Sequence, residues 1–276
     1  KSSTSPDITS ATDAVQIDNS ATEISGIVDD YQSLNSASFT DPTVKAAAAN
    51  HPMAIPFRGY RRDTCANVTM LLTANALTGV DISFKIDYGT AGCKGNDGKV
   101  RMGTITSNYT WVKLGGWSRV SAINLTVDGV QYVGIQTLTA GVTGPNNHAL
   151  FTEHTTLKVT AKDVSWKNWE SNRTRELMEG NGGVNPIKIF KINGNSTFSN
   201  SALENSSYTI SPDAPLMKHS DCKTFTSGTV TIVNKAGVIT TIDYGTGVTC
   251  PDGYTIKTPA DKNGKGGMMR FFKWAK

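Results

Sequence analysis

Two copies of one short segment place aspartates where a metal or a substrate could bind. The sequence Ile-Asp-Tyr-Gly-Thr occurs at residues 86–90 and again at residues 242–246. Each copy is followed by a cysteine and then by an Asp-Gly pair, so a second carboxylate lies nine or ten residues after the first. The four aspartates are Asp87, Asp97, Asp243 and Asp252. Their carboxylates, together with turn carbonyls, would suit calcium, which takes about six to eight oxygen ligands.

The same aspartates also have a simpler use in turns. An aspartate two residues before a glycine can accept a hydrogen bond from the backbone N–H of that glycine and close the turn. We favour this interpretation, because the sequence has neither the ligand spacing of an EF-hand nor a dense ladder of aspartates. Calcium at these aspartates is the alternative, and no other cofactor is expected.

Paired carboxylates are also the catalytic groups of glycoside hydrolases, which need two of them about 5–10 Å apart. Here the candidates lie in two repeats instead of converging on one cleft. The sequence also lacks a Gly-x-Ser-x-Gly nucleophile segment and a Gly-x-x-x-x-Gly-Lys phosphate-binding loop. We therefore predict that the protein is not an enzyme.

The four cysteines repeat with equal spacing. Cys65 and Cys93 are 28 residues apart, as are Cys222 and Cys250. Four cysteines allow three pairings, and the duplication selects the two pairs just named as disulfides. Zinc is the competing use, but there is no Cys-x-x-Cys and we identify no histidine at ligand spacing. Two disulfides predict an oxidising location such as the periplasm or the cell exterior.

Tryptophans are the candidates for stacking against a sugar ring. Trp166 and Trp169 lie close together in the sequence, but they are an odd number of residues apart. On one continuous strand they would face opposite sides, so a shared platform would need a bulge. Packing in the core is the commoner use of such residues.

Short alternating segments between turn residues indicate a mostly β protein. Asp128-Gly129 and Asn193-Gly194 are hairpin signals within these segments. Before them, apolar residues recur at helical spacing over Ile17–Tyr31, behind a flexible leader of residues 1–11. We predict two related antiparallel β-sandwich or barrel-like modules with a short N-terminal helix. The predicted divisions are residues 1–50 for the leader and helix, 51–150 for the first module and 151–276 for the second.

Charge and hydropathy limit the partners. A formal net charge of +4 over 276 residues, without a basic patch, argues against nucleic-acid binding. No apolar run reaches the roughly 18–20 residues that span a bilayer. The Ser/Thr-rich start at Lys1 is typical of the segment that follows the acylated cysteine of bacterial lipoproteins. We therefore expect membrane attachment only through an N-terminal lipid upstream of this sequence.

Several segments resemble, in order, a group of Bacteroidetes lipoproteins. The first segment, residues 86–101, contains a strand, a turn with a cysteine, an Asp-Gly pair and a basic strand. The others are an Arg-Thr-Arg strand at 172–176, a hairpin at 189–194 and the second cysteine module at 222–253. The resemblance covers residues 55–256 and implies a mostly β surface or periplasmic lipoprotein without an established activity. After the second Asp-Gly the chain has Tyr-Thr-Ile-Lys in place of Arg-x-Gly, so we do not expect Arg101 to have a role that both copies share.

These observations predict a non-catalytic lipoprotein of the outer-membrane surface or periplasm. Its role would be structural, adhesive or ligand-capturing, and its partner a glycan or an envelope protein. One alternative is a carbohydrate-binding protein of a glycan-uptake system. A glycan-active enzyme is the more distant alternative.

Overall fold

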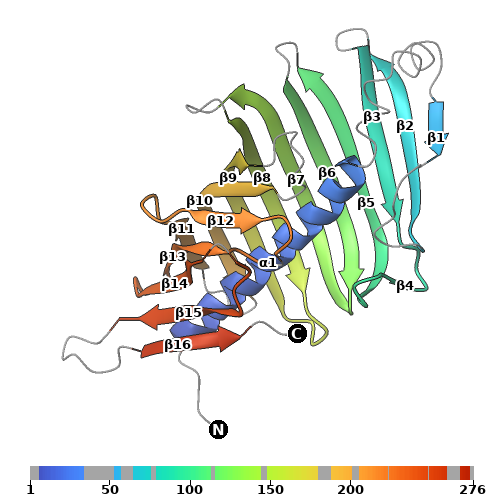
Figure 1. The fold of residues 1–276 in the computed structure, drawn as a ribbon. Helices are drawn as coiled ribbons and strands as arrows, with labels where there is room; N and C mark the ends of the chain where they lie inside the picture. Colours follow the sequence, from blue (N-terminus) through green and yellow to red (C-terminus); the bar gives the residue numbers. More distant parts are fainter. Residues whose placement is uncertain are drawn as a thin grey trace. The chain divides into compact units, whose positions relative to one another are not determined.

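A computed structural model shows a mostly β protein: one antiparallel sheet and an N-terminal helix (Figure 1). It describes residues 6–33, 53–56, 65–75, 79–112, 116–143, 148–179, 188–200, 205–222, 224–247, 249–259 and 268–273. The prediction of an antiparallel, mostly β protein with an N-terminal helix is confirmed. The predicted leader residues 1–5 and most of the segment that joins the helix to the first strand lie outside these ranges.

The strands follow one another along the chain after the single helix. The element bounds are α1 Pro6–Ser33, β1 Met53–Pro56, β2 Asn67–Asn75, β3 Gly79–Asp87, β4 Cys93–Lys94, β5 Val100–Val112, β6 Gly116–Val127, β7 Val130–Thr143, β8 Ala149–Thr160, β9 Trp166–Glu179, β10 Ile189–Asn200, β11 Asn205–Ile210, β12 Leu216–His219, β13 Ser227–Val233, β14 Ile239–Thr246, β15 Gly253–Thr258 and β16 Met268–Lys273. Asp128-Gly129 forms the predicted turn between β6 and β7. The prediction of a hairpin at Asn193-Gly194 was wrong, because this pair lies within β10 and continues its pairing with β9.

The helix is longer than the sequence pattern predicted. It begins at Pro6, where a proline fits the first turn because the backbone N–H that it lacks would have no partner there. Apolar and small residues before Ile17 already form its buried side; Ala11, Ala14 and Val15 are all at most 1% exposed. The abundance of Ser and Thr hid this stripe in the sequence, so half of the expected leader is helix. None of the helical residues described here forms an apolar stretch long enough to cross a membrane.

The chain forms two compact units. Unit 1 contains residues 1–22, 142–154 and 167–276, and unit 2 contains residues 23–141 and 155–166. Each disulfide lies within one unit. The helix contributes its first part to unit 1 and its second part to unit 2, so each unit contains a helical segment and strands.

In unit 2 the strands pair in the order β1-β2-β3-β5-β6-β7, with β4 added beside β5. Side chains alternate between the two faces, as expected for strands. One face is buried and includes Phe84, Ile86, Ile105, Tyr109 and Leu125. The other face is open to solvent along β5, β6 and β7.

In unit 1 the strands from β9 onward pair in the order β9-β10-β11-β13-β14-β15-β16. The short strand β12 pairs with the first part of β10 and with one residue of β13. The buried face is rich in aromatic residues; Trp169, Tyr208, Phe225 and Tyr244 are each at most 2% exposed. Trp169 meets Tyr208 edge to face with 5.3 Å between ring centroids, a favoured geometry for aromatic pairs.

A glycine on β5 allows the first repeated turn to dock. Gly103 donates its N–H to the Gly89 carbonyl at 2.8 Å and accepts from Tyr88 N–H at 2.9 Å. Its φ is +96°, and a Cβ there would lie 2.2 Å from the Asn124 carbonyl oxygen of β6. Only glycine satisfies both constraints.

Replacing Gly103 therefore tests the docking of this turn. We expect Gly103→Ala to lower the free energy of unfolding by at least about 3 kcal/mol, because backbone strain and a backbone clash add together. The matched control is Gly98→Ala, with a φ of +81° but nothing within 4 Å of the added Cβ, which should cost about 1–2 kcal/mol. Urea unfolding of both variants measures the difference, and equal losses would contradict the role of the Asn124 contact.

Candidate functional site

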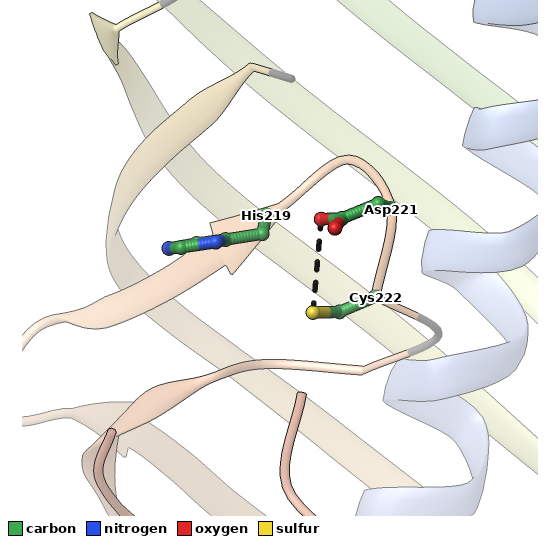
Figure 2. A group of neighbouring side chains, drawn as sticks. All are labelled: His219, Asp221 and Cys222. Carbon is green, nitrogen blue, oxygen red and sulfur yellow. Dashed lines mark hydrogen bonds between the residues drawn. The ribbon is translucent and has the colours of Figure 1, made fainter. Parts of the chain in front are cut away.

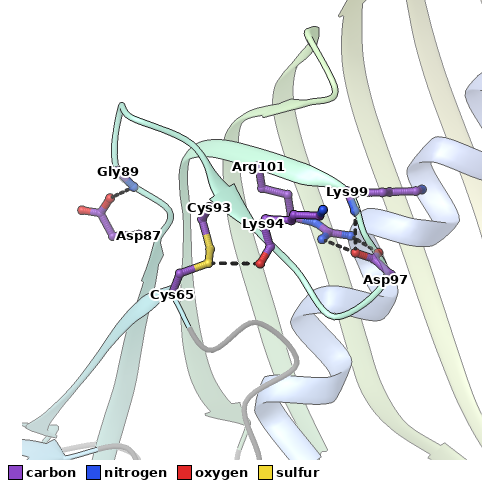
Figure 3. Close-up of a disulfide and its surroundings, with 8 residues drawn as sticks. All are labelled: Cys65, Asp87, Gly89, Cys93, Lys94, Asp97, Lys99 and Arg101. Carbon is purple, nitrogen blue, oxygen red and sulfur yellow. Dashed lines mark hydrogen bonds and ion pairs between the residues drawn. A yellow bond between two sulfur atoms is a disulfide. The ribbon is translucent and has the colours of Figure 1, made fainter.

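All four cysteines are paired as the duplication predicts. Cys65 bonds to Cys93 with a Cα–Cα distance of 5.5 Å, and Cys222 bonds to Cys250 with a Cα–Cα distance of 5.2 Å. No cysteine is free. Figure 3 shows the first disulfide beside the repeated turn. Two disulfides indicate an extracytoplasmic protein, since such bonds persist in oxidising compartments.

The first aspartate of each repeat closes its turn in the same way. Asp87 accepts a hydrogen bond from Gly89 N–H at 2.9 Å, and Asp243 accepts one from Gly245 N–H at 2.9 Å. The second carboxylate oxygen in each case lies 2.7 Å from a lysine Nζ, that of Lys85 or Lys257. Hydrogen bonds from these lysines, together with the backbone bonds, lower the pKa of both aspartates. The geometry is that of turn closure.

The second aspartates differ between the repeats. Asp97 holds the guanidinium of Arg101 with two hydrogen bonds of 2.9 and 2.6 Å and accepts Lys99 N–H at 3.1 Å (Figure 3). Asp252 is exposed, and the residue four positions later is the buried Ile256. The loss of the arginine in the second copy, anticipated from the sequence, thus removes the partner that Asp97 has in the first.

The two tryptophans do not form a joint platform. Both lie on β9, where burial alternates, and Trp169 is 2% exposed while Trp166 is half-buried. The ring of Trp169 packs against Phe198, Tyr208 and the guanidinium of Arg173. Its faces are therefore not available to a sugar at the surface. The ring of Trp166 has Lys158 Nζ 5.8 Å from its centroid.

The densest polar arrangement was not predicted, and in unit 2 it lies where α1 contacts β5 and β6. Arg101 and Arg119 are both 0% exposed. Arg101 Nη2 lies 3.2 Å from Glu23, whose other oxygen lies 2.6 Å from Lys99 Nζ. Arg119 Nη1 lies 2.6 Å from Asp29, and its Nη2 donates to Gln136 at 3.1 Å. Each helix carboxylate therefore neutralises a cation of the sheet.

Electrostatics keep Arg119 charged. Burial disfavours the charged form of Arg119, but Asp29 and Tyr109 outweigh that effect and raise its pKa. The Tyr109 hydroxyl, 3.4 Å from Arg119 Nη1, has a raised pKa because it is buried. Neither group changes its protonation state near neutral pH, so they form a fixed ion-pair arrangement.

Unit 1 repeats the arrangement with a deeper ion pair. Asp18 is 0% exposed and accepts Arg173 Nη1 at 2.5 Å and the Tyr208 hydroxyl at 2.5 Å. Arg173 lies against the rings of Trp169 and Tyr208, with its Cζ 5.6 and 5.4 Å from their centroids. Burial raises the pKa of Tyr208 well above its ordinary value. A second pair joins Asp13 and Lys167 at 2.6 Å.

The helix supplies all four of these carboxylates, and its charged residues are all acidic. It contains six of the 23 acidic residues of the chain and none of its 27 basic residues. This composition is a signal that sequence reasoning missed. The partner arginines could not be assigned from the pattern, since they lie 78–155 residues away.

A separate group of potential ligands lies after β12 in unit 1 (Figure 2). One ligand atom each from His219, Asp221 and Cys222 lies within 4.8 Å of the others. The prediction that no histidine stands at ligand spacing was wrong for His219, which is three residues before Cys222. Beside them, burial lowers the pKa of Lys218 to about 8. Among the described residues this is the one group of three potential metal ligands.

Comparison with known proteins adds no assignment. No protein-family model, no curated protein and no solved structure matches this chain. The site must therefore be interpreted from its own geometry, in which buried charges hold α1 against the strands of each unit.

The pair between Asp18 and Arg173 provides a test of this interpretation. Asp18→Asn should lower the free energy of unfolding by about 3–5 kcal/mol, because it deprives the buried charge of Arg173 of the carboxylate that it is hydrogen-bonded to. The matched control is Asp13→Asn, whose more exposed pair should contribute about 1 kcal/mol. Urea unfolding gives both values.

A second replacement separates the charge from the packing. In Asp18→Asn/Arg173→Met the buried charge is gone, and the amide oxygen of the new asparagine still accepts the Tyr208 hydroxyl. Much of the lost stability should therefore return. If this double variant is no more stable than Asp18→Asn alone, an unpaired charge is not the cause of the loss.

The turn aspartates predict an acid dependence of stability. Their folded-state pKa is lowered, so their charge stabilises the fold above the unfolded pKa of about 4 and this contribution is lost as pH falls through the folded pKa. Asp87→Asn/Asp243→Asn keeps the acceptor oxygens but cannot titrate. At pH 7 it should lose about 1 kcal/mol or less per site, because both pairs are exposed to solvent.

Urea unfolding from neutral pH down to about pH 2 checks this prediction. The stability difference between the wild type and the double variant should shrink below about pH 4 and vanish at the acid end. A difference that stays constant over this range would contradict the linkage.

Proposed function

We propose that the protein is a non-catalytic, extracytoplasmic surface protein that makes contact through the solvent face of unit 2. The supporting observation is the composition of that face on β5, β6 and β7. Side chains that point away from α1 there alternate with the buried ones over Thr104–Thr110, Ser118–Thr126 and Gln131–Thr139. All of them are uncharged.

This uncharged face also exposes branched apolar side chains. Val120, Val133 and Ile135 are 42%, 43% and 51% exposed, and Ala122 lies directly opposite Ile135. Charged side chains are one of the devices by which β proteins avoid unwanted association. Interface centres, in contrast, are depleted of charged residues. A face of threonine, asparagine and exposed aliphatic residues suits contact with another protein.

A protein partner fits this face better than a glycan does. Sugar rings stack on flat aromatic side chains, and the outward residues of these three segments include no aromatic residue. Trp166, the half-buried one of the two candidate tryptophans, lies on β9 and has a lysine over its ring. Glycan binding for uptake is therefore the second candidate, supported by this one ring.

A structural or adhesive role also agrees with where the charges are used. The buried arginines are neutralised by carboxylates of α1 or, for Arg101, also by Asp97. Such pairs fix the position of a helix, whereas catalysis needs a titrating group with access to a substrate. The proposal thus excludes an enzyme.

The proposed location is the periplasm or the outer-membrane surface. The two disulfides support a place outside the cytoplasm. The resemblance to Bacteroidetes lipoproteins supports attachment through a lipid anchor. Mass spectrometry of the protein from its native envelope would detect such an acylated N-terminal segment.

Site-specific photo-cross-linking tests the contact face. A photoreactive residue at Ile135 should give a discrete adduct in the cells that produce the protein. The same residue at Val164, which is 79% exposed in the turn between β8 and β9, is the matched control and should not give it. Ala122→Lys should suppress the adduct, because it places a charge opposite Ile135.

The outcomes separate the two candidate functions. Equal adducts from both positions, or none from either, would contradict the proposed face. A glycan array distinguishes the alternative: we expect no bound glycan. Binding that is lost in Trp166→Ala would instead support the carbohydrate-binding function.

A further inference from the structure

The loop after β12 combines nitrogen, oxygen and sulfur ligands at one place. His219 ends β12, and Asp221 and Cys222 follow within three residues (Figure 2). Their ligand atoms lie within 4.8 Å of one another, and Cys222 Sγ is 3.8 Å from Asp221 Oδ1. Imidazole, carboxylate and thiolate are the ligands that zinc takes in proteins.

In the disulfide form this group is incomplete. The sulfur of Cys222 is bonded to Cys250, and a thiolate, not a disulfide, is the metal ligand. His219 and Asp221 then provide two ligands, too few for a closed tetrahedral site. The disulfide therefore controls whether the group can bind a metal.

We propose that reduction of the Cys222–Cys250 disulfide creates a zinc site from His219, Asp221, Cys222 and Cys250. A dithiol reductant donates two electrons and two protons: the S–S bond breaks, two thiols form and the reductant becomes a disulfide. Zinc then binds both sulfurs as thiolates and releases their two protons. This inference does not depend on the proposed function.

The three ligand atoms that already lie together need only a small closure. With Zn–S near 2.3 Å and Zn–N near 2.0–2.1 Å, the ligand atoms of a tetrahedral site lie roughly 3.3–3.8 Å apart. The three observed ligand atoms, within 4.8 Å, need to approach by about 1 Å. Cys250 is bonded to Cys222, so its sulfur starts beside that of Cys222, and after reduction the two sulfurs move apart to the spacing of tetrahedral ligands.

Exposure allows each step to occur. Cys250 is exposed, so a reductant can reach its sulfur, and Asp221 is exposed, so a metal ion can enter. Cys222 is 5% exposed and would be the buried ligand of the site. Oxidation of the two thiols would release the metal, because the disulfide removes two of the four ligands.

The other disulfide is an internal control. Cys65 and Cys93 have the same spacing, but the sulfur of Cys65 lies 3.5 Å from the Lys94 carbonyl oxygen (Figure 3). In the part of the chain that the structure describes, no group of three metal-ligating side chains includes either cysteine. The two pairs should therefore differ in zinc affinity once reduced.

Zinc titration of two cysteine variants tests the proposal. Cys65→Ser/Cys93→Ser retains the predicted site, and Cys222→Ser/Cys250→Ser removes it. Each protein is reduced with dithiothreitol, desalted without oxygen and titrated with Zn²⁺ against a chromophoric chelator. The reduced first variant should bind one Zn²⁺ at least about a hundredfold more tightly than its oxidised form or the second variant.

Ligand replacements and cobalt identify the coordinating groups. In the reduced first variant, His219→Ala and Asp221→Ala should each weaken Zn²⁺ binding by about tenfold or more. Co²⁺ should give the absorption of a tetrahedral thiolate complex, and His219→Ala should reduce it. If a cysteine variant does not fold, by circular dichroism, the same comparisons are made in the reduced wild type and its His219→Ala variant. Equal affinities with and without His219, or for both cysteine pairs, would overturn the proposal.

Discussion

The ion pair between Asp18 and Arg173 is the contact on which the position of α1 in unit 1 depends. Both groups are buried, and the Tyr208 hydroxyl completes the shell of the carboxylate. Bringing two charges out of water is costly, and their attraction offsets this cost only when the geometry is good. Such a pair adds little net stability, yet displacing the helix would leave a buried charge without a partner. The pair therefore specifies one position for the helix more than it strengthens the fold.

The same logic explains why the N-terminal segment is part of the core. In unit 2, Glu23 and Asp29 are placed against Arg101 and Arg119 as Asp18 is against Arg173 in unit 1. Serines sit on the buried face in both units, where Ser107 pairs with Ser121 and Ser171 pairs with Ser196. Small side chains on the strands and alanines on the helix reduce the distance that charged groups must span. A Ser/Thr-rich sequence is thus compatible with a buried helix when its apolar stripe consists of small residues.

The sequence predicted interactions between residues that are close along the chain better than interactions between distant ones. Each cysteine pair and each turn aspartate lies within one short repeated segment, so comparing the two copies of that segment identified them. The start of α1 was misjudged because Ala11 and Ala14 are only weakly hydrophobic signals, although burial makes them core residues. The buried arginines could not be found, since an arginine on an alternating strand looks the same whether it faces water or a carboxylate 155 residues away.

The two repeats show which features a duplication preserves. Ile86 and Ile242 are 0% exposed, Tyr88 and Tyr244 are also buried, and Gly89 and Gly245 both adopt positive φ. In both copies the turn is closed by the aspartate two residues before the glycine, so this part of the repeat needs no distant partner. Arg101 depends on Glu23 of α1 as well as on Asp97, and at the corresponding place the second copy has Ile256. Unit 1 receives its own helix contact through Arg173 on β9, so the buried Ile256 needs no carboxylate of α1 as a partner. The turn was therefore free to persist in both units while the charges that hold the helix were arranged separately in each.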